Sequence, residues 1–222
     1  MTKYALFDLD GTLSDPKVGI TTCAKLALDY FGIQVENLEE LEPLIGPPLK
    51  GSFMDRYGLS DEQADKALEI YRSRFSTKGL YENEMYPGID SMLSHLKEKG
   101  YQLSVASSKP TVFVERILEY FDIKKYFHHV VGSLLDGRRV DKDEVVEEAL
   151  RLLGVTEESK NEAVMIGDRM FDVIGAKSHG ITSIAVSYGY GSREELENSN
   201  PDYIVDTVEE LENLLLSLSL TA

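Results

Sequence analysis

The feature that most constrains the fold is the order of apolar segments from about residue 86 onward. Short apolar runs, each typical of a buried strand, alternate with longer segments whose apolar residues recur every three or four positions. The expected strands are 3–7, 101–106, 127–132, 163–166, 181–186 and 203–205, and helical patterns follow Gly88, Pro110, Asp141, Met170, Ser192 and Asp206. A repeated strand-then-helix order is typical of an α/β fold with a doubly wound, Rossmann-like parallel sheet.

One interval between expected strands is too long for this alternation. Between the strands at 3–7 and 101–106, the chain is about three times as long as the roughly 30 residues of a strand-helix-strand unit. Residues 15–85 carry no good strand pattern, but they show helical patterns at 18–31, 49–57 and 61–75. The sequence therefore predicts a helical unit inserted after the first strand.

We expect an α/β core domain of residues 1–14 and 86–222 and an α-helical cap domain of residues 15–85. The two crossings between them, at 14–17 and 80–87, contain or adjoin residues that favour turns. These crossings are candidate hinges between cap and core.

Composition and charge exclude several functions. The chain has 222 residues, 42% of them hydrophobic, and a formal net charge of −16, which disfavours binding to nucleic acid or anionic membranes. Cys23 is the only cysteine, so no intramolecular disulfide can form. Asp8 comes too early for a signal peptide, and no apolar run reaches the roughly 18 residues of a spanning helix. We expect a cytoplasmic protein and leave the choice between monomer and homodimer open.

Polar residues gather where the expected strands end. In open parallel sheets, ligands bind beyond the carboxyl ends of the strands. Gly11 breaks the first strand, so the carboxyls of Asp8 and Asp10 can turn toward different partners. The residues at these strand ends, with one lysine at a helix start, are Asp8, Asp10, Ser107, Ser108, Lys109, Lys142, Asp168 and Asp172.

Four carboxylates at one edge of a sheet repel one another unless a cation neutralises them. Ligands that are all oxygen atoms favour Mg²⁺, which leaves coordination positions for water and a phosphate oxygen. Lys109, Lys142 and the Ser107 hydroxyl supply what the remaining oxygens of a phosphate require. The pattern therefore predicts a magnesium site that binds a phosphate group, and closure of the helical cap is expected to confine the substrate to a small phosphorylated metabolite.

These segments resemble, one by one, the motifs of the haloacid dehalogenase superfamily of phosphohydrolases. The matching segments are Phe7-Asp8-Leu9-Asp10-Gly11-Thr12, Ala106-Ser107-Ser108-Lys109-Pro110, Lys142, and Ile166-Gly167-Asp168-Arg169 with Asp172. The interval between the first two is where this superfamily carries its C1 helical cap. Within the superfamily, the chain most resembles the phosphoglycolate phosphatase and 5′-nucleotidase-like branch.

The resemblance implies a role for each matched residue. Asp8 would be the nucleophile that attacks phosphorus, and Asp10 the acid and base that serves first the leaving alcohol and then water. The implied Mg²⁺ ligands are Asp8, the backbone carbonyl of Asp10 and Asp168, and Asp172 would either ligate the ion or orient a water bound to it. The implied phosphate-binding residues are Gly11, Thr12, Ser107, Ser108, Lys109 and Lys142. Whether Lys142 or Lys109 makes the main phosphate contact stays open.

A phosphomonoesterase acting on phosphoglycolate or a 5′-mononucleotide is the leading interpretation. Thr12 argues against a sugar phosphomutase, because mutases with this cap usually carry an apolar residue there. Asp10 argues against a haloacid dehalogenase and a phosphonate-cleaving enzyme, which usually lack that second acid. A non-catalytic phosphoacceptor or binding module also places acids and a lysine at sheet ends, but the helical insertion and Asp10 argue against it.

Three further segments have expected places around the site. Asp15 precedes Pro16 and is expected to cap the first inserted helix. The cap turn Ile45-Gly-Pro-Pro-Leu49 is expected to face the core. The loop Tyr188-Gly-Tyr-Gly191 follows a strand and either borders the site or is a plain flexible loop.

Overall fold

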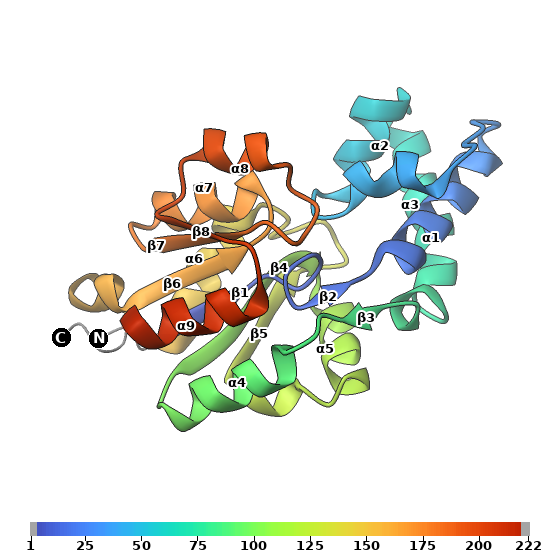
Figure 1. The fold of residues 1–222 in the computed structure, drawn as a ribbon. Coiled ribbons are helices and arrows are strands. Elements are labelled where there is room, and N and C mark those ends of the chain that lie inside the picture. The colour runs from blue at the N-terminus through green and yellow to red at the C-terminus, as the bar shows by residue number, and fades with distance from the viewer. Residues whose placement is uncertain (1–3, 219–222) are drawn as a thin grey trace.

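The computed structural model describes residues 4–218. Within them, six strands form one parallel sheet in the order β5-β4-β1-β6-β7-β8 (Figure 1). These strands are β1 (Tyr4–Phe7), β4 (Gln102–Pro110), β5 (His129–Ser133), β6 (Ala163–Gly167), β7 (Thr182–Val186) and β8 (Tyr203–Val205). The predicted doubly wound α/β core is therefore confirmed, although Lys3, predicted in the first strand, lies outside the described residues.

Helices cover both faces of the sheet, because its central strand is apolar on both sides. Ala5 and Phe7 of β1 pack into one hydrophobic cluster, and Leu6 between them packs into another on the opposite face. α8 (Arg193–Ser199) packs Leu196 against Val173 and Ala185. The first face is covered by α4 (Ile89–Glu98), α5 (Thr111–Tyr120) and α9 (Val208–Leu218), and the second by α6 (Lys142–Leu153) and α7 (Met170–Ser178).

Residues between β1 and β4 form a helical unit, which Figure 1 shows as a separate group beside the sheet. Gly58 ends α2 in the left-handed conformation, and Ser60 begins α3 with a capping box completed by Gln63. The three predicted helical segments match α1, α2 and α3 closely, and the domain division at 15–85 stays a prediction. The elements are α1 (Lys17–Tyr30), η1 (Leu38–Leu44), α2 (Leu49–Tyr57), α3 (Asp61–Phe75) and η2 (Gly79–Tyr81).

The two crossings between the sheet and the helical unit pair with each other. β2 (Ser14–Asp15) and β3 (Glu84–Met85) form a two-stranded antiparallel ribbon. The apolar pattern predicts no strand in residues 15–85, and it misses this ribbon because a strand of two residues has no alternation to detect. Asp15 was predicted to cap α1, but the N-cap residue is Pro16, and Asp15 lies one position before it, where its side chain accepts a hydrogen bond from the Lys17 backbone N–H at 2.9 Å.

Most predicted strands agree with the structure within about two residues at each end, and β4 is the exception. It continues to Pro110 with an irregular register after Ser107, so the residues predicted to follow this strand form its irregular end. The short 3-10 helices η3 (Lys124–Tyr126) and η4 (Glu157–Glu162) precede β5 and β6. No helix within residues 4–218 is both long enough and apolar enough to span a membrane.

Candidate active site

Three buried carboxylates gather where the carboxyl ends of β1 and β6 meet. Asp8 follows β1, Asp168 follows β6, and Asp172 lies in the first turn of α7. Because β1 and β6 pair with Phe7 opposite Ile166, the residues that follow these strands reach the same edge of the sheet. One carboxylate oxygen from each acid lies within 4.8 Å of the other two. We call Asp8, Asp168 and Asp172 the acidic cluster.

Lys142, the first residue of α6, places its ammonium against the acidic cluster. Its Nζ lies 3.1 Å from Asp8 Oδ1 and 2.7 Å from Asp172 Oδ1. The same Nζ donates a hydrogen bond to the Ala106 carbonyl at 3.0 Å. Burial works to lower the pKa of Lys142, but the attraction of Asp172 and Asp8 outweighs burial and the pKa is raised. Lys142 is therefore a fixed positive charge beside the acids.

The acidic cluster carries more negative charge than its surroundings neutralise. Burial raises the pKa of Asp168 well above its usual value, and the charges of Asp172 and Asp8 raise it further. Burial also raises the pKa of Asp172 to about 6, against the lowering effect of Lys142. Asp8 Oδ1 and Asp172 Oδ1 share one cationic partner, the Lys142 ammonium. Three ionised carboxylates facing one ammonium leave a surplus of negative charge, so these oxygens fit a hard divalent cation.

Asp10 is close to Asp8 in the sequence but faces a different partner. Lys109, at the end of β4, places its Nζ 2.8 Å from Asp10 Oδ1 and 2.6 Å from Oδ2. Burial raises the pKa of Asp10, and the charge of Lys109 opposes that rise. Gly11 allows the chain to turn here, since its φ of 82° is left-handed and a Cβ would lie 2.1 Å from Asp168 Oδ2. The two acids of the first motif therefore have separate surroundings.

Asp10 and Lys109 line a cavity of about 880 Å³ between the edge of the sheet and the helical unit. Within residues 4–218, Asp10 is the one acid predicted to act in catalysis or metal binding that lines this cavity. Other wall residues are Leu44, Leu49, Leu68, Tyr71 and Phe75 from the helical unit and Ser108, Phe113 and Leu134 from the core. A cavity of this size can hold a small metabolite.

Residues 5–186, which are most of the chain, match the protein family described as haloacid dehalogenase-like hydrolase. The chain belongs to this family. The resemblance predicted from the motifs is thereby confirmed, and all four motif segments lie within the matched residues.

Relatives of this haloacid dehalogenase-like hydrolase match it over nearly its whole length. A crystal structure of a predicted phosphatase from Clostridium acetobutylicum has a TM-score of 0.94 and 47% identity, over 98% of this chain and 99% of that one. A Pseudomonas aeruginosa protein named 5′-nucleotidase is 42% identical, over 96% of this chain and 95% of that protein. A Mycobacterium tuberculosis protein named tyrosine-protein kinase PtkA is 34% identical, over 96% of this chain and 72% of that protein. A Vibrio parahaemolyticus protein named phosphoglycolate phosphatase is 31% identical, over 94% of each.

The predicted phosphate-binding residues of this hydrolase other than the two lysines lie in two places. Gly11 and Thr12 lie beside the acidic cluster, where the Thr12 hydroxyl donates a hydrogen bond to Asp168 Oδ1 at 3.3 Å. Ser107 is buried and its Oγ accepts a hydrogen bond from the Lys109 backbone N–H at 3.3 Å. Ser108 lines the cavity. Contact between these residues and a phosphate stays a prediction.

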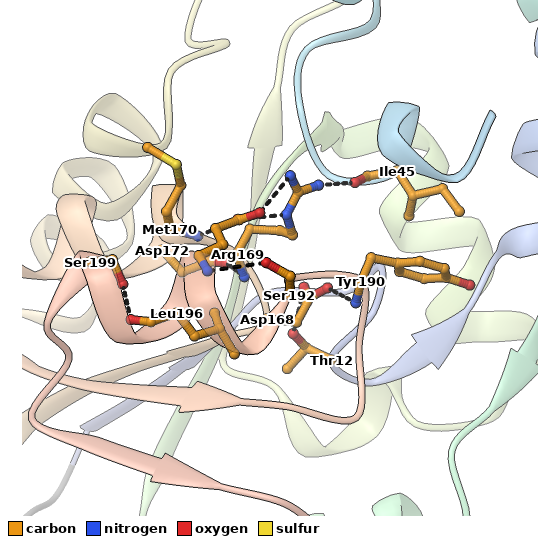
Figure 2. Close-up of polar contacts among 11 residues, drawn as sticks. Thr12, Ile45, Asp168, Arg169, Met170, Asp172, Tyr190, Ser192, Leu196 and Ser199 are labelled. Carbon is orange, nitrogen blue, oxygen red and sulfur yellow. Dashed lines mark hydrogen bonds and ion pairs between the residues drawn. The ribbon is translucent and has the colours of Figure 1, made fainter. Parts of the chain in front are cut away.

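The loop 188–191 packs closely against Asp168 of this hydrolase. The Tyr190 backbone N–H donates a hydrogen bond to Asp168 Oδ2 at 2.7 Å, as Figure 2 shows. A Cβ on Gly189 would lie 2.3 Å from the Asp168 Cβ, so a glycine is required for this approach. The Tyr190 hydroxyl also donates to Asp15 Oδ1 on the ribbon. Of the two interpretations left open by the sequence, the loop therefore borders the site.

Arg169 has a role in this hydrolase that the sequence does not reveal. Its buried guanidinium contacts Glu195 Oε1 through Nε at 2.8 Å. Its Nη1 donates a hydrogen bond to the Ile45 carbonyl at 2.6 Å (Figure 2). Gly46 packs against the same side chain, so the turn that begins at Ile45 faces the core as predicted. Because Ile45 is 124 positions away in the sequence, no local pattern links it to Arg169.

Proposed function

We propose that this haloacid dehalogenase-like hydrolase is a Mg²⁺-dependent phosphomonoester hydrolase that acts through an aspartyl-phosphate intermediate. The observation that carries the proposal is the separation of the two acids of the first motif. Asp8 lies with the acidic cluster and Lys142, where a cation and a phosphoryl group can be held. Asp10 faces the cavity, where the leaving group can lie. The reaction needs a nucleophile and a proton donor with such separate surroundings.

In the first step, a carboxylate oxygen of Asp8 attacks the phosphorus atom of the monoester and forms a P–O bond. The P–O bond to the alcohol breaks, its electron pair stays on the alcohol oxygen, and that oxygen takes the proton of Asp10. Asp8 then carries the phosphoryl group and Asp10 is a carboxylate. Lys142, 3.1 Å from Asp8 Oδ1, offsets the repulsion between the anionic phosphate and the attacking carboxylate.

In the second step, water attacks phosphorus and gives one proton to Asp10. The P–O bond to Asp8 breaks, and its electron pair returns to the Asp8 carboxylate as inorganic phosphate leaves. Asp10 is protonated again and the starting state is restored. One carboxyl group thus serves first as acid and then as base, so no second proton donor is needed.

The proposed ligands of the cation are Asp8, Asp168, Asp172 and the backbone carbonyl of Asp10. Bound Mg²⁺ would supply positive charge to the oxygens of the phosphoryl group. Three carboxylates that meet around a single ammonium, that of Lys142, support a divalent ion. Asp168 accepts hydrogen bonds on both oxygens, from Thr12 and from Tyr190, which fixes its orientation toward the cluster.

We place the substrate among small phosphorylated metabolites, with phosphoglycolate and 5′-mononucleotides the first to test. Relatives named 5′-nucleotidase and phosphoglycolate phosphatase support this choice. The volume of the cavity, about 880 Å³, favours small molecules over phosphoproteins. A screen of phosphorylated metabolites with Mg²⁺, reported as kcat/KM, distinguishes the candidates. A cytoplasmic location and a monomeric or homodimeric state stay predictions.

Hydrolysis of p-nitrophenyl phosphate tests the proposed reaction. We expect phosphate release with Mg²⁺, none with excess EDTA, and recovery when Mg²⁺ is restored. Asp8→Asn should lower kcat by at least about 10³-fold, because the nucleophile is lost. Asp10→Asn should lower it by about 10² to 10⁴-fold, because the base that activates water in the second step is lost. Circular dichroism of both variants should match that of the wild-type protein.

Other outcomes identify the alternative functions. A phosphoacceptor module would become labelled by phosphate without turnover, and a phosphomutase would isomerise a sugar phosphate without releasing phosphate. Full activity of Asp8→Asn would rule out the proposed mechanism.

A further inference from the structure

Lys109 lies at the junction of the sheet and the helical unit, between Asp10 and an aromatic ring of α3. Its Nζ is 2.8 Å and 2.6 Å from the two carboxyl oxygens of Asp10. The same ammonium lies 4.8 Å from the centre of the Phe75 ring, which is a cation–π contact. The Lys109 side chain is only 7% exposed. A buried cation therefore links an acid of the core to a ring of the helical unit.

The Phe75 ring is itself held by both parts of the molecule. It stacks on Tyr71 of α3 with ring centres 5.1 Å apart. It also meets Phe113 of α5 in an edge contact with ring centres 5.4 Å apart. Phe75 and Tyr71 are buried, so the ring has little freedom to leave the ammonium.

The two buried lysines of the site have different surroundings, which separates their tasks. Lys142 contacts two members of the acidic cluster, Asp8 and Asp172. In residues 4–218, the ion pair formed by Lys109 is with Asp10. A lysine that served the phosphate alone would be expected beside Asp8, where phosphorus is attacked. Lys109 instead contacts the carboxyl group from which the leaving alcohol takes its proton.

We propose that Lys109 is a positioning residue that orients the carboxyl group of Asp10 for proton transfer, and that Phe75 holds Lys109 in place. The inference rests on the proposed role of Asp10 as proton donor. Contacts from one ammonium to both carboxyl oxygens restrict rotation of the carboxyl group. When one oxygen carries the proton, the other keeps its contact with the ammonium. A donor misplaced by about 1 Å loses on the order of 10²-fold in rate, so this restriction matters for catalysis.

Two aryl phosphates of similar size test this role, because their leaving groups need a proton to different degrees. p-Nitrophenolate is a weak base and leaves without protonation, whereas the more basic phenolate leaves more readily when an acid protonates it. The quantity to compare is kcat/KM, which reports the steps up to phosphoryl transfer to Asp8 and excludes the later hydrolysis. For Lys109→Met, we expect kcat/KM to fall about 10²-fold with phenyl phosphate and by less than about tenfold with p-nitrophenyl phosphate.

Matched variants separate positioning from a general loss of charge or of cavity shape. Lys50→Met removes another lysine of the same cavity, one that pairs with Asp61 and Asp65, and should change kcat/KM for both esters by the same factor. Lys109→Arg keeps a cation that can contact both oxygens of a carboxyl group. The ratio of kcat/KM for the two esters should therefore be close to the wild-type ratio.

The ring that contacts Lys109 provides a test that leaves the ion pair intact. Phe75→Leu removes the cation–π contact and should shift the ratio in the same direction as Lys109→Met, by a smaller factor. Phe171→Leu removes another ring that lines the cavity, one whose cation–π contact is with Arg169, so the ratio should stay at the wild-type value. This pair stays informative even if Lys109→Met does not fold.

The outcomes distinguish this inference from the function on which it rests. Equal losses for both esters in Lys109→Met would overturn it and indicate a lysine that binds phosphate. If Asp10→Asn also lowers kcat/KM by the same factor for both esters, the proposed function fails and the inference fails with it. The same holds if the wild-type protein hydrolyses neither ester. A preferential loss with phenyl phosphate in both Asp10→Asn and Lys109→Met supports both.

Discussion

At the scale of single residues, the surroundings of each acid decide its chemistry more than its place in the sequence. Asp8 and Asp10 are close neighbours in the chain, yet one faces Lys142 and the other faces Lys109. Burial and neighbouring charges, which no short sequence motif contains, separate the partners of these acids and raise the pKa of Asp10. The clearest consequence concerns the dependence of stability on pH.

Without a bound metal, the acidic cluster should destabilise the folded protein more as pH rises. Folding raises the pKa of Asp172 from 3.8 to about 6 and raises that of Asp168 well above 3.8, so the folded state holds these protons more tightly. For Asp172, the resulting loss of stability is absent below about pH 4, grows up to about pH 6 and is complete above it, and Asp168 adds a loss in the same direction. In EDTA, we expect Asp168→Asn to gain stability over the wild-type protein as pH rises, because the buried carboxylate is removed. Urea unfolding at several pH values measures this difference.

Mg²⁺ should reverse this effect, because it binds the ionised carboxylates in competition with protons. Its stabilisation should reach about 2.7 kcal/mol at a hundredfold excess over Kd near pH 7.5 and be much smaller near pH 5. In the control variant Asp61→Asn, Mg²⁺ should stabilise the fold as much as in the wild-type protein, since this side chain is 74% exposed and lies outside the cluster. An equal gain from Mg²⁺ at both pH values would contradict metal binding by these acids.

The candidate site was predictable from the sequence as far as its residues lie at the ends of regular elements. Asp8, Asp168 and Lys142 were found because apolar periodicity locates strand ends and helix starts. The pairing of Asp10 with Lys109 was not predictable, because the two residues are 99 positions apart and the choice of lysine depends on side-chain direction. Arg169 was missed for the same reason, since its partners come from distant segments.

At the scale of helices and strands, the site is built from the ends of elements that the fold brings together. The alternation of strands and helices along the chain and the helical insertion were predictable, because each long element buries a periodic apolar face that is encoded locally in the sequence. The ribbon β2–β3 and the irregular end of β4 were not, because pairing between distant segments determines both. Contacts between element ends therefore need separate tests.

The contact between the start of α7 and the turn before α2 predicts a specific loss of stability. Arg169→Met removes the donor to the Ile45 carbonyl and leaves Glu195, whose side chain is 21% exposed, without its ion-pair partner. We expect the free energy of unfolding to fall by about 3 kcal/mol, because the remaining charge is largely buried. Urea denaturation measures the change.

Arg193→Met is the matched control for this variant. Arg193 lies in the same part of the chain, but its side chain and those of its acidic partners are all more than half exposed. Its loss should cost about 0.5 kcal/mol. Similar losses for the two variants would mean that the buried contacts of Arg169 do not stabilise the fold.

At the scale of the whole molecule, the site differs from the protein that surrounds it. The formal net charge is −16, and the proposed substrate is an anion. Lys142 and Lys109 attract an anion only at short range, because each is already paired with acids. The approach of a phosphate ester is therefore opposed by the field of the protein at long range.

This opposition predicts an unusual response to salt. Raising the ionic strength from about 0.01 M to about 0.15 M shortens the Debye length from about 30 Å to about 8 Å. We expect kcat/KM for p-nitrophenyl phosphate to rise severalfold over this range, with little change in kcat, because screening weakens the repulsion. Thermal unfolding in the same buffers controls for an effect of salt on stability. A fall in kcat/KM with salt would instead indicate that local cations attract the substrate at long range.

The ribbon β2–β3 has a consequence for how such a protein can change over evolutionary time. The chain leaves the core and returns to it at neighbouring points, with Ser14 opposite Met85 at a separation of about 5 Å, as in any antiparallel pair. If the gene is cut at these two codons, the DNA that encodes the corresponding helices of a relative can be inserted between them. The distance between Ser14 and Met85 then stays the same. Recombination at these two points can thus change the helical unit and the substrate range, while the catalytic edge of the sheet is inherited unchanged.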